Sequence, residues 1–168
     1  EIMSFYGGEF EVRNKEDKSP VTTADENAEA IIVDGLKSLT PNIPIVAEEA
    51  MDGGVIPDVS GGRFWLVDPL DGTKEFVNQR EELTGNIWLV DNSTPAVGVV
   101  GAPALATTYS GSAPGTAFVQ RGTDAPQPIS ARITPVDGGI VTASRSHSDM
   151  KKIQQLMKNL SIKRMKIS

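Results

Sequence analysis

The sequence predicts an α+β fold, in which a largely antiparallel sheet with helices is followed by the first elements of an α/β unit. Three stretches carry this prediction. Residues 22–41 have apolar side chains at helical spacing, residues 83–120 contain short β segments separated by turn residues, and residues 138–168 run in the order strand, helix, strand. The change of pattern along the chain indicates two domains.

Two helices are predicted in the N-terminal part of the chain. Residues 1–7, EIMSFYG, read as the end of a helix that stops at a glycine. In residues 22–41 the apolar side chains recur every three or four positions, and Pro41 ends the pattern. This second segment is therefore predicted to be an amphipathic helix.

The segments that follow read as strands. Residues 43–49, IPIVAEE, are predicted to form a short buried strand that ends in two acids, and a loop rich in Gly, Pro and Asp leads to a second strand at residues 63–68. Beyond Leu83, short β segments are separated by turns, which predicts an antiparallel meander. These segments are residues 84–91, 95–103, 106–112 and 115–120.

A domain boundary is predicted in the proline-rich stretch 123–135. We therefore expect a metal- and phosphate-binding α+β domain over residues 1–134. Residues 135–168 contain a strand, a polar turn, a helix and the opening of another strand, and we expect them to begin a C-terminal α/β domain that is truncated in this chain.

Composition limits the classes of function. The 168 residues have 22 acidic and 16 basic side chains and a formal net charge of −6, so a nucleic-acid partner is not expected and metal cations are favoured. The absence of cysteine excludes disulfides, thiolate zinc sites and a cysteine nucleophile. No apolar run is long enough to span a bilayer, so we expect a cytoplasmic protein, with peripheral membrane association left open.

Two aspartates close to each other mark residues 64–76, FWLVDPLDGTKEF, as the candidate site. An apolar strand ends at Asp68, Pro69 keeps the chain extended, and Asp71 opens a turn. Both carboxylates can face one point, and the carbonyl of Leu70 could join them. Mg²⁺ prefers such oxygen ligands, so this segment predicts a metal site.

The residues around these aspartates bear on the same prediction. Gly72 and Thr73 would open a helix whose free N–H groups can bind a phosphate. An ordinary turn is the alternative, because Asp-Pro and Asp-Gly are common in turns. Glu48 and Glu49 favour the metal site, because two acids at the end of a buried strand are costly unless a cation offsets their desolvation. For Glu49, a solvated surface position stays an alternative.

Asp25 has two compatible interpretations. Thr23 and Glu26 have the spacing of a capping box, in which Asp25 would complement the dipole of the first helical turn. An acid held at a helix start could also accept a proton from a hydroxyl such as that of Thr73, which would orient a metal-bound water. His147 is the only histidine, and the polar turn SRSHS favours a solvated side chain there.

A covalent route through an aspartyl phosphate is not expected. Phosphatases of the haloacid-dehalogenase type also contain DGT, with a nucleophilic aspartate two residues before the aspartate of that motif. The corresponding residue here is Pro69, which has no nucleophilic side chain. A metal-activated water is therefore the predicted attacking group.

Together these motifs resemble those of a known family. VAEE and WLVDPLDGTKEF, with SPVTTAD upstream, resemble the lithium-sensitive, Mg²⁺-dependent phosphatase superfamily of inositol monophosphatase and fructose-1,6-bisphosphatase. With GVVGAP and SRSHSD they are most similar to 3'(2'),5'-bisphosphate nucleotidases of the CysQ type. The resemblance runs along essentially the whole chain and implies a layered α/β/α/β/α sandwich.

The resemblance also implies roles for individual residues. Metal binding is implied for Glu48, Asp68, the carbonyl of Leu70 and, at a second ion, Asp71. Catalysis is implied for Asp25, Thr73 and Glu48. Substrate binding is implied for Gly72, Thr73, Ser144, Arg145, Ser146 and His147.

The activity implied by the resemblance is Mg²⁺-dependent hydrolysis of the 3'-phosphate of 3'-phosphoadenosine 5'-phosphate, giving AMP and phosphate with two or three Mg²⁺ ions. The family's third metal-binding aspartate lies in a W-D-x-A-A motif that this sequence lacks, so the second metal site would be incomplete and we expect a fragment of a longer protein.

The alternatives to this activity are an inositol or sugar phosphatase of the same superfamily and a non-catalytic metal- or nucleotide-binding module. A homodimer, lithium sensitivity and the roles of Gly85 and Trp88 stay open.

Overall fold

The chain forms two compact units in a computed structural model, Glu1–Ile129 and Ser130–Ser168. The predicted domain boundary between residues 134 and 135 stays a prediction. No helix in the described part of the chain is long and apolar enough to cross a membrane. The structure describes residues 1–8, 11–14, 20–113, 115–144, 148–158 and 162–167.

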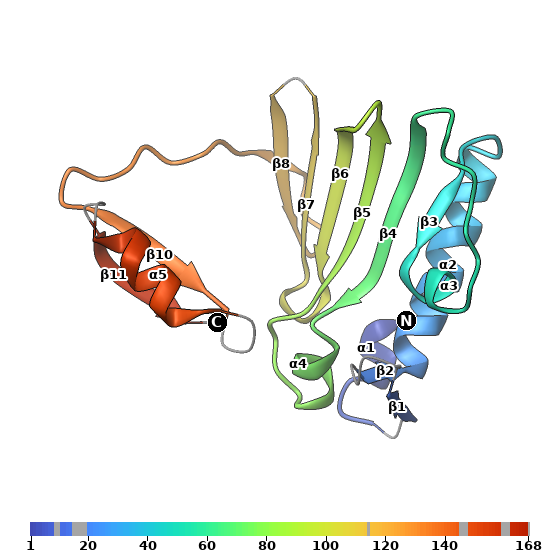
Figure 1. Cartoon of the computed structure of the whole chain (residues 1–168), viewed down its shortest axis with the longest axis horizontal. Helices are drawn as coiled ribbons and strands as arrows, with labels where there is room; N and C mark the ends of the chain where they lie inside the picture. Colours follow the sequence, from blue (N-terminus) through green and yellow to red (C-terminus); the bar gives the residue numbers. More distant parts are fainter. Residues whose placement is uncertain (9–10, 15–19, 114, 145–147, 159–161, 168) are drawn as a thin grey trace. The chain divides into compact units, whose positions relative to one another are not determined.

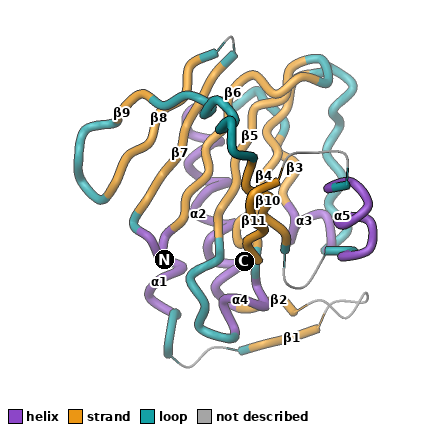
Figure 2. The backbone as a smooth tube through the Cα atoms, turned by 90° about the vertical axis from the view of Figure 1, so that its left-hand side faces the viewer, coloured by secondary structure: helices purple, strands orange, loops and turns teal. Residues whose placement is uncertain are grey.

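A seven-stranded sheet forms the centre of the Glu1–Ile129 unit, with the strand order β3-β4-β5-β6-β7-β8-β9 (Figure 1). Strand β3 is parallel to β4 and every other neighbouring pair is antiparallel, so the predicted meander and α+β class are confirmed. The short strand β9 lies at one edge (Figure 2). The strands are β3 Ile45–Ala47, β4 Arg63–Asp71, β5 Thr84–Asp91, β6 Thr94–Ala102, β7 Thr107–Ser112, β8 Thr116–Arg121 and β9 Gln127–Pro128.

Helices and a small hairpin accompany this sheet. The hairpin consists of the antiparallel strands β1, Val12–Asn14, and β2, Pro20–Thr22. Helix α2, Thr23–Leu39, follows β2 directly and lies alongside β3 and β4 (Figure 1). The remaining helices are α1 Ile2–Phe5, α3 Glu48–Asp52, α4 Thr73–Val77 and the 3₁₀ helix η1 Pro103–Leu105.

One hydrophobic cluster packs α2 against the sheet. It contains Leu36 of α2, Ala47 of β3 and Val67 of β4, with the half-buried Trp65 against them. Successive side chains of a strand point to opposite faces, so Leu66, between Trp65 and Val67, lies on the face away from α2. Asp68 follows Val67 in β4, so the same alternation makes Asp68 point away from α2, as Leu66 does.

A second cluster lies next to the end of β4. It joins Ala24 at the start of α2 to Leu70, Phe76 and Leu83, and α1 and the adjoining Tyr6 pack against it. The rings of Tyr6 and Phe76 lie 5.8 Å apart between centroids at an angle of 58°. This cluster fixes the first turn of α2 beside the turn between β4 and α4.

Strand β4 carries an irregularity where the candidate site begins. Asp68 pairs with Asn86 and Asp71 pairs with Thr84, so the β4 side has one more residue than the β5 side. Proline cannot donate a ladder hydrogen bond, and Pro69 therefore suits such a bulge.

The roles of Gly85 and Trp88, which the sequence left open, follow from close approaches across β5. A Cβ atom at Gly85 would lie 3.1 Å from the carbonyl oxygen of Pro69, so glycine makes room for the bulge. Trp88 pairs with Gly98 of β6, where a Cβ atom would lie 3.2 Å from the indole Cδ1. The indole of Trp88 thus covers a residue that has no side chain.

The Ser130–Ser168 unit has the predicted order of strand, helix and strand. Strands β10, Gly139–Ala143, and β11, Ile162–Ile167, are parallel, and α5, Met150–Met157, lies between them in sequence. Asp149 caps α5 by accepting hydrogen bonds from the backbone N–H groups of the second and third residues of the helix, at 3.0 and 3.2 Å. A parallel pair connected through a helix is a βαβ unit.

Candidate metal and phosphate site

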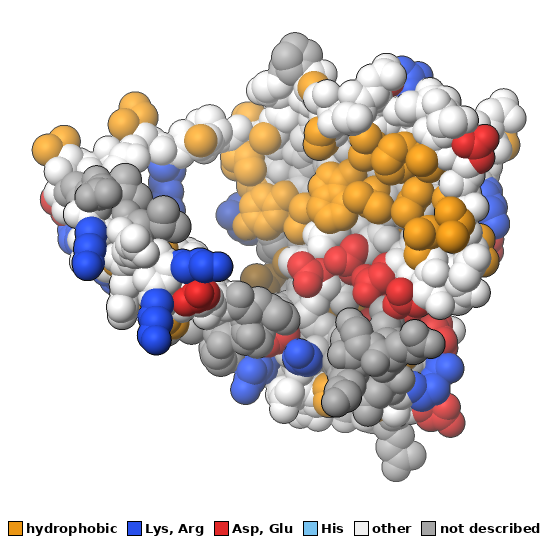
Figure 3. Space-filling view, viewed as in Figure 1, with side chains coloured by type: hydrophobic (Ala, Val, Ile, Leu, Met, Phe, Trp, Pro, Cys, Tyr) orange, Lys and Arg blue, Asp and Glu red, His pale blue; other side chains and the backbone are white. Residues whose placement is uncertain are grey.

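Acidic side chains gather on one face of the Glu1–Ile129 unit. Figure 3 shows them as a band that borders an apolar patch. The sheet face away from α2 carries this patch. Strand alternation and the register of neighbouring strands place on that face the side chains of Leu66, Trp88 and Tyr109. The candidate site is therefore an acidic margin beside an apolar sheet face.

The first acids of the site come from the junction of β3 and α3. The predicted strand over residues 43–49 is wrong at its end, because β3 stops at Ala47 and Glu48 already begins α3. The helical start suits the acids, since negative charge is favourable at a helix N-terminus. Glu48 is exposed and Glu49 is half-buried.

Burial and neighbouring charges perturb the carboxyl group of Asp68. Its pKa is raised from 3.8 to about 7, first by burial of its carboxyl group and then by the negative charges of Glu48 and Asp71. An interaction with the side chain of Asn86 opposes this rise in pKa. The Oδ1 atom of Asp68 is buried and has no hydrogen-bond partner among the described residues.

These observations fit a hard divalent cation. A buried carboxylate oxygen without a partner is costly, and a cation beside it would remove that cost and lower the pKa of Asp68. In the described parts of the chain, no three acidic or histidine side chains are arranged as a metal-holding group. The site thus offers neighbouring oxygen donors rather than a closed cage, which suits Mg²⁺ because Mg²⁺ usually keeps several of its waters.

Leu70 and Thr73 meet at the turn after the bulge. The side chain of Leu70 is buried, and its carbonyl oxygen lies 3.1 Å from Thr73 Oγ1. Thr73 Oγ1 also lies 2.9 Å from Asp25 Oδ1. A hydroxyl has only one proton, so a hydroxyl that donates to Asp25 leaves the Leu70 carbonyl available to another partner.

The capping box at the start of α2 differs from the prediction by one residue. It is formed by Thr22 and Asp25, not by Thr23 and Glu26. Asp25 Oδ2 accepts hydrogen bonds from the backbone N–H of Thr22 at 2.8 Å and from its hydroxyl at 2.5 Å. Glu26 is exposed and forms an ion pair with Arg13 at 2.5 Å.

This capping arrangement immobilises Asp25 in the protein interior. The residue is only 2% exposed, and each carboxylate oxygen has a partner, Thr22 on one side and Thr73 on the other. The predicted pairing of Asp25 with Thr73 is therefore present as a contact over 48 residues of sequence.

Gly72 occupies a position that only glycine accommodates. Its φ is +95°, and a Cβ atom there would lie 2.8 Å from the carbonyl oxygen of Glu82. Gly72 is the residue before α4, and Thr73 is the first residue of that helix. Both lie beside Asp71, as the sequence motif predicts.

The predicted substrate segment lies in the other unit. Ser144 follows β10 and is exposed. Arg145, Ser146 and His147 lie outside the described residues. Their implied contact with a nucleotide stays a prediction.

Two buried polar residues near the site were missed by the sequence analysis. Glu29 is 7% exposed and accepts backbone N–H hydrogen bonds from Glu49 at 2.7 Å and from Ala50 at 2.8 Å. Asn86 is 6% exposed and pairs with Asp68 across β4 and β5. The available signals were an acid four residues after Asp25 on the same helix, and an amide inside the apolar strand TGNIWLV.

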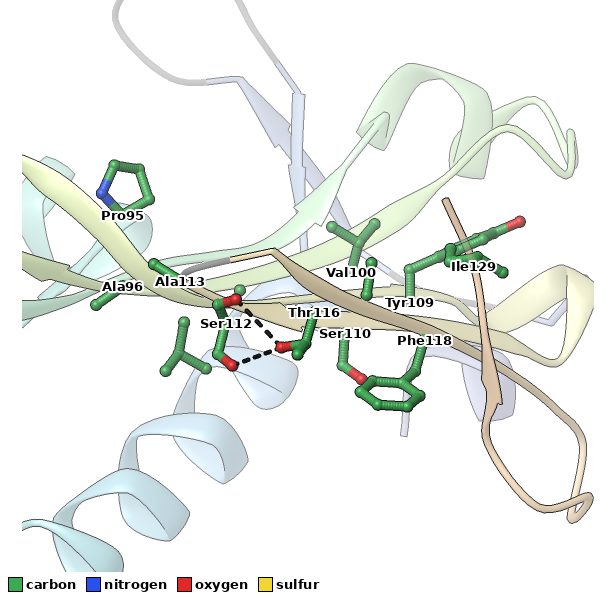
Figure 4. Close-up of a pocket in the computed structure, with 14 residues that line it drawn as sticks. Pro95, Ala96, Val100, Tyr109, Ser110, Ser112, Ala113, Thr116, Phe118 and Ile129 are labelled. Atoms are coloured by element: carbon green, nitrogen blue, oxygen red, sulfur yellow. Dashed lines mark hydrogen bonds between the residues drawn. The ribbon is translucent and has the colours of Figure 1, made fainter. Parts of the chain in front are cut away.

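A separate pocket of about 470 Å³ lies on strands β6 to β8, and the predicted site residues are not part of its lining. Figure 4 shows Tyr109, Phe118 and Ile129 around it. The hydroxyls of Ser112 and Thr116 also line it and form a hydrogen bond of 2.8 Å. The candidate site is therefore defined by its carboxylates rather than by this hollow.

The chain belongs to the inositol monophosphatase family, because the model of the inositol monophosphatase family matches residues 1–168. Among curated proteins, the 3'(2'),5'-bisphosphate nucleotidase CysQ of Escherichia coli O6:H1 is 42% identical over 150 residues, which cover 88% of this chain and 59% of that protein. The CysQ of Salmonella typhimurium is 40% identical over the same shares of both chains. The chain thus spans less than two thirds of the length of these relatives.

Solved structures of the family have the same fold. The CysQ of Bacteroides thetaiotaomicron matches 98% of this chain and 66% of its own with a TM-score of 0.73 and 28% identity. An IMPase of Thermotoga maritima matches 99% of this chain and 61% of its own with a TM-score of 0.75 and 26% identity.

Proposed function

We propose that the protein containing this chain is a Mg²⁺-dependent phosphatase that hydrolyses the 3'-phosphate of 3'-phosphoadenosine 5'-phosphate to give AMP and phosphate. The observation that carries the proposal is the buried Oδ1 of Asp68, which has no hydrogen-bond partner among the described residues while the charges of Glu48 and Asp71 raise the pKa of its carboxyl group. The nearby hydroxyl of Thr73, held by Asp25, supports hydrolysis rather than binding alone.

Glu48, Asp68 and the carbonyl of Leu70 would hold a first Mg²⁺, and Asp71 would bind a second. Mg²⁺ bound there would supply positive charge that activates water and stabilises the phosphate as its charge develops. Burial and the negative charges of Glu48 and Asp71 all raise the pKa of Asp68, and a bound cation would offset each of these effects.

Asp25 and Thr73 would handle the proton of the attacking water. A Thr73 hydroxyl that donates to Asp25 Oδ1 directs the lone pairs of its own oxygen away from Asp25, toward a water molecule. The proton of that water can move to Thr73 Oγ1 as the proton of Thr73 moves to Asp25. Thr22 holds the other oxygen of Asp25, so the carboxylate keeps the required orientation.

The phosphate would be held at the turn into α4, where the backbone of Gly72 and Thr73 lies next to Asp71. Identity of 40 to 42% with the CysQ bisphosphate nucleotidases supports a bisphosphorylated nucleotide as the substrate. An inositol or sugar phosphate is the second candidate, because the family and the fold are shared with inositol monophosphatases.

The test is phosphate release by the full-length protein from 3'-phosphoadenosine 5'-phosphate and from inositol 1-phosphate, each with Mg²⁺ and with a chelator. We expect release that requires Mg²⁺ and a higher kcat/KM for the nucleotide. A higher kcat/KM for inositol 1-phosphate would assign the second candidate. Absent or metal-independent release from both compounds would contradict the proposal and favour a binding module.

A further inference from the structure

We propose that Glu29 is a positioning residue that fixes the first turn of α3 and thereby holds Glu48 toward Asp68. The inference rests on the proposed function, because it concerns how a proposed metal ligand is oriented. Glu29 would touch neither metal nor substrate. Its effect would pass through the backbone of the residues that follow Glu48.

The contacts of Glu29 are those of a helix cap supplied by another helix. The first N–H groups of any helix lack partners within the helix. The residue before α3 is Ala47, which has no side-chain acceptor, and Glu29 of α2 accepts the N–H groups of Glu49 at 2.7 Å and Ala50 at 2.8 Å instead. Hydrogen bonds to an ionised acceptor are stronger than those between neutral groups.

Glu48 lies between two fixed points of the backbone. On one side, Ala47 is 2% exposed and pairs with Val67, the residue before Asp68. On the other side, Glu29 holds the N–H of Glu49. The backbone of Glu48 therefore has little freedom to turn its side chain away from Asp68.

The burial pattern of α2 separates Glu29 from the other acids of the helix. Glu26 and Asp34 are exposed, whereas Glu29 is buried on the same side as Asp25. A carboxylate in such a place costs free energy unless its hydrogen bonds compensate for lost hydration. A cap that served stability alone would not need to lie next to a candidate ligand, so the decisive measurement is metal affinity.

Glu29→Gln and the control Asp34→Asn would be compared in the full-length protein. Glutamine has the size of glutamate but places an NH₂ group, which cannot accept a hydrogen bond, against one backbone N–H. Asp34→Asn makes the same change of charge at an exposed position of the same helix. Mg²⁺ and Mn²⁺ binding would be measured by calorimetry without substrate, and phosphate release would be followed against Mg²⁺ concentration.

We expect Glu29→Gln to weaken metal binding by about 10- to 100-fold, as changes next to metal ligands commonly do. The Mg²⁺ concentration for half-maximal activity should rise by a similar factor, with kcat largely recovered at saturating Mg²⁺. Asp34→Asn should bind metal like the wild type. If Glu29→Gln does not fold, Glu29→Asp, which keeps the charge but is too short to reach both N–H groups, is judged by the same measurement.

Equal metal affinity in the wild type and a folded Glu29 variant would overturn the positioning role, even if the variant unfolds at a lower temperature. A wild-type protein that binds no divalent metal would overturn the proposed function as well. If the wild type binds metal but releases phosphate from neither substrate, and Glu29→Gln weakens metal binding, the positioning of Glu48 is supported and the proposed reaction is contradicted.

Discussion

Burial and neighbouring negative charges both disfavour the ionised form of the Asp68 carboxyl group. Its ordinary pKa is 3.8, and in the folded chain the pKa is about 7. Between these values the folded state binds more protons than the unfolded state, so the free energy of unfolding falls as the pH rises from about 4 to about 7 without divalent metal.

Asp68→Asn should therefore stabilise the protein at pH 8 in the presence of a chelator. We expect a gain on the order of 1 to 2 kcal/mol, smaller than the full pKa shift implies because Asp68 is partly exposed to solvent. The gain should disappear below about pH 3, where Asp68 is largely neutral in both states. Thermal unfolding as a function of pH measures this difference, and parallel pH profiles for wild type and variant would contradict it.

Thr73 tests the proposed proton path at the same scale. Thr73→Val keeps the shape of the side chain but removes the hydroxyl between Asp25 and the Leu70 carbonyl. We expect kcat of the full-length enzyme to fall by about 10²- to 10⁴-fold, the usual contribution of proton transfer by a side chain. Metal affinity should change little.

The control for Thr73→Val is Thr108→Val, which makes the same change at an exposed position of β7. It should leave kcat at the wild-type value. A Thr73→Val enzyme with a normal kcat would exclude the hydroxyl from the reaction.

Among the helices and strands, those with regularly spaced apolar residues or clear turn residues were predicted well from sequence. The apolar spacing of α2 and the turn residues of the β5–β8 meander each reflect burial of one face, which leaves a direct pattern in the sequence. The end of β3 was predicted poorly. Glu48 and Glu49 directly follow the apolar residues of the strand, and no local sequence signal shows that a helix begins there. The side chain that accepts the N–H of Glu49 in the first turn of that helix belongs to Glu29, 20 residues before Glu49.

The start of α2 shows why a local rule can miss by one residue. Thr22 with Asp25 and Thr23 with Glu26 both have capping-box spacing. The first pair is chosen because it places Asp25 in the interior and leaves Glu26 in solvent near Arg13. Tertiary packing, which the two overlapping motifs do not encode, decides between them.

The turn between β4 and α4 depends on a glycine with a left-handed backbone. Gly72→Ala should destabilise the protein more than Gly54→Ala, because φ is positive at both, but only at Gly72 would the new Cβ meet a backbone oxygen at 2.8 Å. We expect a loss of about 1 kcal/mol for Gly54→Ala from strain alone and about 2 to 4 kcal/mol for Gly72→Ala.

Urea unfolding of the two alanine variants beside the wild type gives both losses of free energy. Equal losses would mean that the turn relaxes around the new methyl group. In that case the close approach to the carbonyl of Glu82 would not be what requires glycine at position 72.

At the scale of the molecule, the two units carry opposite charge. Residues 1–129 contain 20 acidic and eight basic side chains, whereas residues 130–168 contain two acidic and eight basic side chains. The acidic excess from which the sequence predicts cation binding thus belongs to the unit that holds Glu48 and Asp68. The overall charge of −6 hides this division, which becomes visible once the units are known.

Among the described residues, the exposed first residues of the Ser130–Ser168 unit should be the first point of cleavage. Ile133 and Val136 are 94% and 105% exposed, and Arg132 lies beside them outside any strand or helix. Proteases prefer such extended, exposed segments. Limited trypsin treatment should first cut after Arg132, as mass spectrometry of the fragments will show, and Arg132→Gln should slow this cut. Initial cleavage after Arg63, within β4, would contradict the assignment of compact units.

Helix α2 carries Asp25 and Glu29 four residues apart. This spacing constrains the length of the helix between them, because it sets the directions in which the two side chains point. Four residues advance an α-helix by about 400°, so both carboxylates lie within about 40° of one direction, one turn apart. One residue inserted between them would rotate Glu29 by about 100° relative to Asp25. The carboxylate that meets Thr73 and the carboxylate that meets α3 could then no longer both be in place. The exposed position Glu26 should tolerate substitution, whereas the number of residues from Asp25 to Glu29 should not vary.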